Sequence, residues 1–148
     1  GKIELFCQDL EDRFGYGVPR YEALARDLPF AIISPSSSKR TNATFGGCTE
    51  SQGIEILEIN PADAAARGIH DGQKVRVFNT HGASILPVKV TSDIAPGVTS
   101  MLDGAWFTPN EDGVDTEGSP NAVTAPVTAR CGATTYNSNF VQVRPVNI

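Results

Sequence analysis

Short apolar or alternating runs, separated by turn residues, make up most of this chain, and such runs are typical of β-strands. The pattern predicts roughly seven short strands. They are expected over residues 2–6, 30–33, 54–59, 74–78, 83–90, 98–102 and 140–144. The runs 74–78 and 83–90 flank Asn79-Thr80-His81-Gly82, which predicts a β-hairpin with glycine at the end of its turn.

Two segments have the features of short helices. Residues 18–27 space their apolar positions as a surface helix does, between Pro19 and Pro29. A second helix is expected to begin at Asn60, an N-cap followed by proline, and to end at Gly68. Because long helices do not alternate with the strands, the pattern favours a closed β-barrel over a doubly wound parallel sheet.

Long polar stretches interrupt the strands. Residues 108–139 have little regular pattern, and a loop of that length is more often functional or covered by a partner than idle. Residues 34–44 follow an apolar strand and carry several hydroxyl side chains together with Lys39 and Arg40. Such a loop can present hydroxyls, backbone N–H groups and cations to a phosphate or a heterocycle, although a plain solvated loop has the same composition.

Length, charge and cysteine content narrow the classes of function. A chain of 148 residues favours one compact domain. The net charge of −5, without a lysine-rich stripe, argues against nucleic acid and anionic membrane surfaces as partners. Apolar runs such as Leu28–Ile33 are too short to span a bilayer, so membrane insertion is not expected. The cysteines, Cys7, Cys48 and Cys131, are widely spaced and indicate neither a disulfide framework nor a zinc site.

Familiar catalytic patterns are not found in the sequence. It has no Gly-x-Ser-x-Gly elbow and no glycine-rich phosphate loop. His70 and His81 occur in turns without metal-ligand spacing. The acids of residues 110–117 miss the calcium-loop register, so a solvated acidic loop is expected there. A decarboxylase that cleaves itself at Gly118-Ser119 stays open as an alternative.

Several of these segments, in this order, resemble the C-terminal molybdopterin dinucleotide-binding domain of the dimethyl sulfoxide reductase family. The most specific is Asn60-Pro61-Ala62-Asp63-Ala64 followed by Gly68-Ile69-His70-Asp71-Gly72. The other segments that resemble this family are 1–5, 30–45, 73–79, 94–98 and 118–124. The likeness extends from Gly1 to about Val143.

This resemblance implies a mainly β fold, a double-psi β-barrel with one or two short helices and long polar loops. Residues 1–29 would be a lead-in segment from a preceding domain, and residues 30–148 the barrel. The cofactor would be bis(molybdopterin guanine dinucleotide) with molybdenum or tungsten, shared with the other domains of a longer chain. The resemblance implies cofactor contacts at Ser36, Ser38, Lys39, Arg40, Asn42 and Thr44 on one side and at Asn121, Tyr136 and Asn137 on the other.

By the same resemblance, the longer chain is an oxidoreductase and this domain holds no catalytic or metal-ligating residue, because the cofactor carries the redox chemistry. An iron–sulfur cluster, if present, would lie elsewhere in that chain. The expected partners are its remaining domains and an electron-transfer subunit. The cytoplasm is the favoured location, with the periplasm open if the longer chain carries an export signal. The alternative is a free-standing double-psi barrel that recruits other proteins, but such a module would not need the hydroxyl-rich loop beside Lys39 and Arg40.

Overall fold

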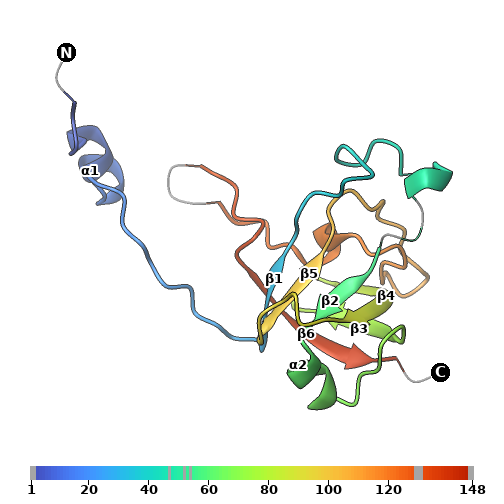
Figure 1. Cartoon of the computed structure of the whole chain (residues 1–148). Coiled ribbons are helices and arrows are strands. Elements are labelled where there is room, and N and C mark those ends of the chain that lie inside the picture. Colours follow the sequence, from blue (N-terminus) through green and yellow to red (C-terminus); the bar gives the residue numbers. More distant parts are fainter. Residues whose placement is uncertain (1–2, 47, 52, 54, 129–131, 147–148) are drawn as a thin grey trace.

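A closed barrel of β-strands is the centre of the molecule (Figure 1). The structure is a computed structural model and describes residues 3–46, 48–51, 53, 55–128 and 132–146. In this part of the chain, six strands close in the order β1-β5-β2-β4-β3-β6. The strands are β1 (Phe30–Ile33), β2 (Leu57–Ile59), β3 (Lys74–Phe78), β4 (Ala83–Val90), β5 (Val98–Met101) and β6 (Asn139–Pro145). The predicted mainly β barrel is confirmed, with the hairpin of β3 and β4 where the sequence indicates it.

The strand directions divide the barrel into two distinct ends. Strand β1 runs parallel to β5 and β2 runs parallel to β4, while the other neighbours in the barrel are antiparallel. This arrangement agrees with the predicted double-psi barrel. Strands β1, β3 and β5 therefore end where β2, β4 and β6 begin. We call this side the loop end, because residues 34–56, 79–82 and 102–138 make its connections. The opposite side, closed by residues 60–73 and 91–97, is the helix end.

Alternation along the strands fills the barrel. Val75 and Val77 of β3 are fully buried, whereas Lys74 and Arg76, which alternate with them, face solvent. The same inward alternation gives the core its aliphatic side chains, whose removal from water stabilises the fold. The largest apolar side chains that are fully buried are Phe30, Leu57, Ile59, Met101, Val75, Val77, Val88, Val123, Val141 and Val143.

The helix end folds as the sequence predicts. Helix α2 (Pro61–Ala65) begins after Asn60, whose side-chain oxygen accepts a hydrogen bond from the Ala62 N–H at 3.0 Å. The Asn60 amide also donates to the Ile94 carbonyl at 2.8 Å, which joins the two connections of this end. The helix itself ends at Ala65, before the predicted Gly68, and Gly68 lies in the turn that follows, with a left-handed φ of 62° that favours glycine.

The N-terminal segment differs from its prediction. Of the strand expected over residues 2–6, Lys2 lies outside the described part, and the described residues 3–6 form no strand. A helix expected over residues 18–27 is also wrong, because all of these residues are described and none is helical. The helix present is α1 (Gln8–Phe14), which ends at the left-handed Gly15.

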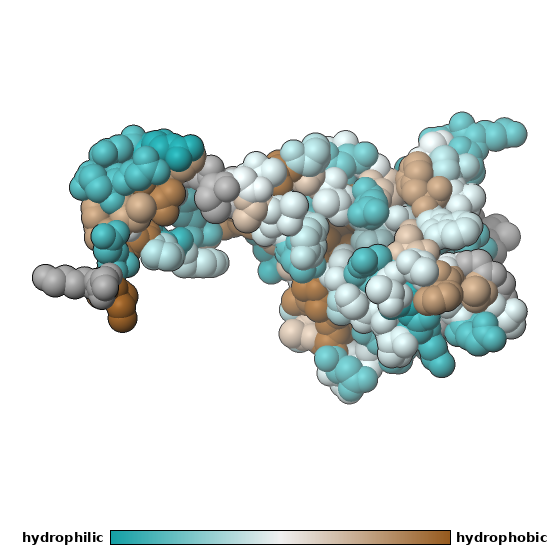
Figure 2. Space-filling view, turned by 90° about the horizontal axis from the view of Figure 1, so that it is seen from above, coloured by the Kyte–Doolittle hydropathy of each residue, from teal (hydrophilic) through white to brown (hydrophobic). Residues whose placement is uncertain are grey.

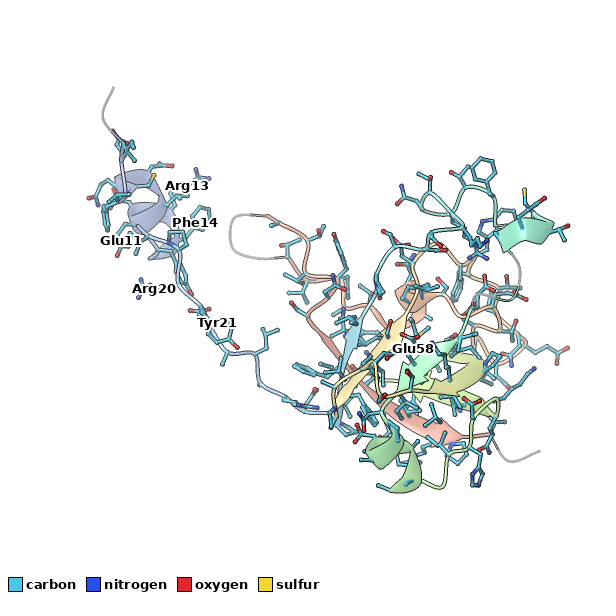
Figure 3. The ribbon with its side chains drawn as sticks, in the orientation of Figure 1. Glu11, Arg13, Phe14, Arg20, Tyr21 and Glu58 are labelled. Carbon is cyan, nitrogen blue, oxygen red and sulfur yellow. The ribbon has the colours of Figure 1, made fainter. Side chains whose placement is uncertain are left out.

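The physical reason for this difference is missing burial. Tyr21 and Leu24, two apolar positions of the expected helix, stay exposed, and a short helix is marginal without an apolar face packed against a core. Residues 3–29 instead form an arm that extends away from the barrel (Figure 1). Apolar side chains on this arm are exposed to solvent (Figure 2). Tyr21 of the arm lies far from Glu58 of the barrel (Figure 3).

One arginine fastens the arm to the helix end. The Arg26 guanidinium donates to the Gly97 carbonyl at 2.7 Å, and it also bonds the Pro29 carbonyl. The Gly97 N–H in turn donates to Asp63 Oδ2 at 2.6 Å. The arm therefore meets the barrel at a defined point, immediately before β1.

Candidate functional site

The predicted cofactor residues all lie at the loop end of the barrel. Six of them belong to the connection from β1 to β2, and the other three belong to the connection from β5 to β6. Segments far apart in the sequence therefore come to one end because β1 and β5 are parallel neighbours. The first set is Ser36, Ser38, Lys39, Arg40, Asn42 and Thr44, and the second is Asn121, Tyr136 and Asn137.

Residues 34–44, which we call the first loop, follow β1 and are held by the segment that follows β5. Ser36 Oγ donates to Asp103 Oδ2 at 3.2 Å, and the Asp103 N–H donates to the Pro35 carbonyl at 3.0 Å. Further along the loop, Trp106 Nε1 donates to the Ala43 carbonyl at 2.9 Å. These contacts fix the course of the loop although it contains no regular structure of its own.

Gly104 permits the closest approach between these two segments. Its φ is 90°, and a Cβ atom added there would lie 2.1 Å from the Asn42 carbonyl oxygen. Asn42 itself has a φ of 50°, a left-handed conformation that asparagine tolerates better than most residues. The backbone at Asn42 is therefore shaped by its fit against Gly104, while the Asn42 side chain is exposed.

Arg40 and Lys39, adjacent in sequence, have different environments. The Arg40 side chain is buried, where it pairs with Glu55 and donates to the Ser51 carbonyl at 2.7 Å. Its Nε atom has no hydrogen-bond partner among the described residues. Lys39 is exposed and takes part in none of the ion pairs that the described residues form. The accessible cation of this loop is therefore Lys39.

Asn121 lies on η2 (Pro120–Val123), a short 3₁₀ helix. It is exposed, whereas the other three residues of η2 are buried. A cavity of about 330 Å³ adjoins it, with walls that include His81 and Phe107. The Asn79 amide donates to the Val123 carbonyl at 2.7 Å and to the Phe140 carbonyl at 3.1 Å, which ties the end of η2 to the barrel.

Tyr136 and Asn137 lie just before β6. The Ser34 N–H donates to Asn137 Oδ1 at 3.0 Å, so this segment touches the beginning of the first loop. The Tyr136 side chain is exposed, while its carbonyl accepts a hydrogen bond from the buried Asn139 amide at 2.6 Å. The three predicted segments thus surround one end of the barrel.

The acidic stretch of residues 110–117 is only partly the solvated loop that the sequence predicts. Glu111, Asp112 and Glu117 are exposed, but Asp115 is completely buried. The prediction is wrong for Asp115 because four donors reach its carboxylate, and one of them, the Ser84 hydroxyl of β4, is too distant in sequence for a local pattern to reveal. The neighbouring apolar Val114, also buried, is the one local sign that this part of the loop folds inward.

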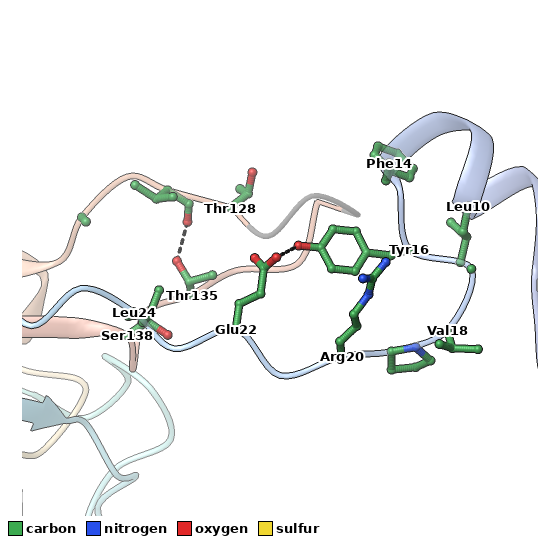
Figure 4. A pocket seen from close by; sticks show the side chains of 14 residues that line it. Leu10, Phe14, Tyr16, Val18, Arg20, Glu22, Leu24, Thr128, Thr135 and Ser138 are labelled. Carbon is green, nitrogen blue, oxygen red and sulfur yellow. Dashed lines mark hydrogen bonds between the residues drawn. The ribbon is translucent and has the colours of Figure 1, made fainter.

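A separate cavity of about 660 Å³ lies between the arm and residues 125–138 (Figure 4). Leu10, Phe14 and Val18 line it from the arm, and Val127 from the barrel side, so its wall is mainly apolar. None of the predicted cofactor residues lines it. It is therefore distinct from the site at the loop end.

The described part of the chain meets neither the requirements of a membrane-spanning helix nor those of a metal site built from His, Cys, Asp or Glu. No helix there is long and apolar enough to span a bilayer. Nor do three or more His, Cys, Asp or Glu side chains come together as ligands for a metal ion within the described residues. Cys7 and Cys48 are free thiols, and Cys131 lies outside the described residues.

Comparison with known proteins decides the family. Residues 30–140 match the family described as the molydopterin dinucleotide binding domain. The chain belongs to this family. The match to the molybdopterin dinucleotide-binding domain thus extends from β1 to the beginning of β6, and it includes every predicted cofactor residue.

Relatives of this molybdopterin dinucleotide-binding domain are much longer proteins. The chain is 31% identical to dimethyl sulfoxide reductase DmsA of Escherichia coli K12, over 99% of this chain and 20% of that protein. It is 42% identical to biotin sulfoxide reductase of Cereibacter sphaeroides, over 60% of this chain and 12% of that protein. The chain therefore spans about a fifth or less of these relatives. The resemblance to the dimethyl sulfoxide reductase family is confirmed, and so is the expected function as its cofactor-binding domain.

The solved structure of acetylene hydratase from Pelobacter acetylenicus has a similar fold. It superposes with a TM-score of 0.62 at 15% identity, over 93% of this chain and 23% of that chain. At this identity the likeness concerns the fold alone. The family match, and not this likeness of fold, favours a cofactor-binding domain over the free-standing recruiting module.

Proposed function

We propose that the loop end of this domain binds and orients bis(molybdopterin guanine dinucleotide) for redox catalysis in a longer chain. One observation carries the proposal: the residues implied by sequence resemblance, from two distant connections, lie together at one end of a closed barrel. A rigid barrel that carries polar loops at one end is a common way to position a ligand.

The chemistry of the exposed side chains supports this assignment. Residues 34–49 contain no Asp or Glu, although the whole chain has 17 acids and a net charge of −5. In this acid-free stretch, Lys39, Ser38 and Thr44 are exposed; Ser36 is exposed too, but its hydroxyl already donates to Asp103. An ammonium group and hydroxyls are suitable donors for phosphate oxygens and for the polar edge of a pterin.

The contacts of each predicted residue suggest different parts in cofactor binding. Lys39 and Asn121 are exposed and can reach a ligand directly, so they are the primary candidates for contact. Arg40 is already engaged with Glu55 and Ser51, so it contributes mainly to the shape of the loop. Asn137 holds the beginning of the same loop through the Ser34 N–H.

When bound, the cofactor supplies the electron-transfer and oxygen-atom chemistry of such enzymes through its molybdenum or tungsten centre. This domain would supply hydrogen bonds and charge that fix the cofactor in position. The protein side chain that coordinates the metal and an iron–sulfur cluster would belong to other domains. An electron-transfer subunit is the proposed partner of the longer chain.

The relatives suggest the reaction class of the longer chain. Those described above are named sulfoxide reductases, so we infer an oxidoreductase that acts on S-oxides or related N-oxides. Within it, residues 1–29 would be the lead-in from a preceding domain and residues 30–148 the cofactor-binding barrel. This division is supported by the match of the family from residue 30 onward.

The test uses the longer protein that contains this chain. Lys39→Ala should lower its content of molybdenum or tungsten and of pterin, measured by metal analysis and by the fluorescence of the oxidised pterin. Removal of a charge-assisted hydrogen bond should weaken binding by roughly tenfold. The matched control is Lys74→Ala, an exposed lysine at the helix end. Equal cofactor content in both variants and the unsubstituted protein would refute the assignment of Lys39.

A further inference from the structure

Asp115 is a completely buried acid to which the proposed function assigns no role. Two donors reach its Oδ2 atom, Ser84 Oγ at 2.6 Å and the Ser119 N–H at 2.8 Å. Two more reach Oδ1, the N–H groups of Thr108 at 2.9 Å and of Glu117 at 3.4 Å. A carboxylate has the capacity to accept all four. None of the ion pairs among the described residues includes Asp115, so neutral donors alone surround it.

The Asp115 backbone is attached to the barrel as well. Its N–H donates to the Ala83 carbonyl at 3.0 Å, and its carbonyl accepts from the Ile85 N–H at 2.8 Å. These bonds pair Asp115 with Ser84 as a single parallel bridge on β4. Because the Ser84 hydroxyl and the backbone of β4 both bond it, Asp115 is fixed to the barrel as well as to its own loop.

One hydrogen bond to the Asp115 carboxylate holds the start of η2. The Ser119 N–H that donates to Asp115 belongs to the residue immediately before η2. The Ser119 carbonyl then accepts from the Ala122 N–H at 3.1 Å, which closes the helical turn. Asn121 lies inside this turn and is its exposed residue. The orientation of Asn121 thus depends on the Asp115 carboxylate at the start of η2, while the Asn79 amide holds the end of η2.

We propose that Asp115 is a positioning residue for Asn121, and that it acts on cofactor binding only through the Ser119 N–H and η2. This inference rests on the proposed function, in which Asn121 contacts the pterin dinucleotide. An asparagine at position 115 has one acceptor oxygen and an NH₂ group, so it would turn a donor toward at least one of the N–H groups that now donate to the carboxylate. Asp115→Asn should therefore release η2 without a change in side-chain volume.

The experiment is a double-mutant cycle in the longer protein, with Asp115→Asn, Asn121→Ala and the combination. The readouts are pterin per chain, from the fluorescence of the oxidised pterin, and hydrogen exchange of residues 119–124. Asp115→Asn and Asn121→Ala should each lower the pterin content by roughly tenfold. The double variant should be no lower than Asn121→Ala alone, because two residues that act through one contact are not additive. Hydrogen exchange over residues 119–124 should become faster with Asp115→Asn.

Two further variants keep the test decisive. Asp112→Asn, an exposed acid of the same stretch, is the matched control and should leave pterin content and hydrogen exchange unchanged. Ser84→Ala removes one donor to Asp115 from a buried strand position, and it replaces Asp115→Asn if that variant fails to fold. It should produce the same changes to a smaller extent.

The outcomes separate this inference from the proposed function. If Asn121→Ala lowers the pterin content but Asp115→Asn does not, the positioning role is refuted and the proposed function stands. Additive losses in the double variant would also refute it, since Asp115 would then act elsewhere. If Asn121→Ala leaves the pterin content unchanged, the contact assumed in the proposed function is wrong.

Discussion

At the helix end, residues 60–73 join β2 to β3 through a helix whose cap, proline and terminal glycine follow one another in the sequence. At the loop end, residues 102–138 join β5 to β6 through polar contacts with distant strands, such as Asp115 with Ser84. The helix of the first end is specified by local interactions, to which the bond from Asn60 to Ile94 is added, whereas the second end depends more on contacts with distant strands. The conformation of the candidate site is therefore more sensitive to buried polar groups than to local propensity.

The largest effect is expected from Glu55→Gln at the loop end. This change leaves the buried Arg40 guanidinium without its carboxylate partner, and breaking a buried ion pair is strongly destabilising. We expect a loss of about 3 kcal/mol in the free energy of unfolding, the low side of the range because Glu55 is partly exposed. Urea unfolding of the chain measures this loss. A loss no larger than that of Glu58→Gln, in an exposed pair, would show that the loop end does not depend on Arg40.

An intermediate effect is expected from Asn60→Ala at the helix end. This variant removes the cap of α2, which typically costs about 1 kcal/mol, and the bond to the Ile94 carbonyl. Asn60→Asp is the matched variant, because it keeps the capping oxygen and loses only the donor to Ile94. Urea unfolding should rank the wild type above Asn60→Asp and Asn60→Asp above Asn60→Ala. If the two variants are equally unstable, the cap contributes little to this end.

The smallest effect concerns the exposed pair of Lys89 and Glu58, with Nζ and Oε1 at 2.9 Å. The hydrogen bond and the charge of Glu58 raise the pKa of Lys89 above its ordinary value of 10.5. A raised pKa means that the pair stabilises the fold fully below pH 10.5 and loses this contribution as the pH rises through the higher value. Solvent screens such a pair, so its contribution is small.

Lys89→Gln tests this pH dependence. Its urea midpoint should lie slightly below that of the wild type at neutral pH, and the two should converge as the pH rises above 10.5. Lys74→Gln, an exposed lysine that forms none of the ion pairs among the described residues, should show no such convergence. A Lys89→Gln difference that persists in alkali would mean that packing of the lysine chain, and not its charge, is what matters.

Local patterns account for what could be predicted from the sequence. The apolar run at Phe30–Ile33, the alternation around Val75 and Val77, and the Asn60 cap each specify an element through neighbours in the chain. The arm shows where this reasoning fails. Residues 18–27 have a helical spacing of apolar positions, but they have no core against which to pack. All of these residues are described, and they form no helix.

The candidate site was predictable in composition but not in arrangement. Sequence resemblance pointed to residues 36–44 and to Asn121, and it treated Lys39 and Arg40 alike. The structure separates them, because Glu55 draws Arg40 into a buried pair and leaves Lys39 exposed. Glu55 lies beyond the loop in sequence, so no local pattern could indicate this difference.

The sequence by itself determined a mainly β barrel with a capped helix, since strand alternation and helix capping arise from contacts between near neighbours in the chain. Only the tertiary structure decided which polar side chains face solvent at the loop end. Asp115 illustrates the reason: a buried carboxylate is tolerated only where donors surround it, and its donors come both from its own connection and from Ser84 of β4. These donors meet only when the barrel closes.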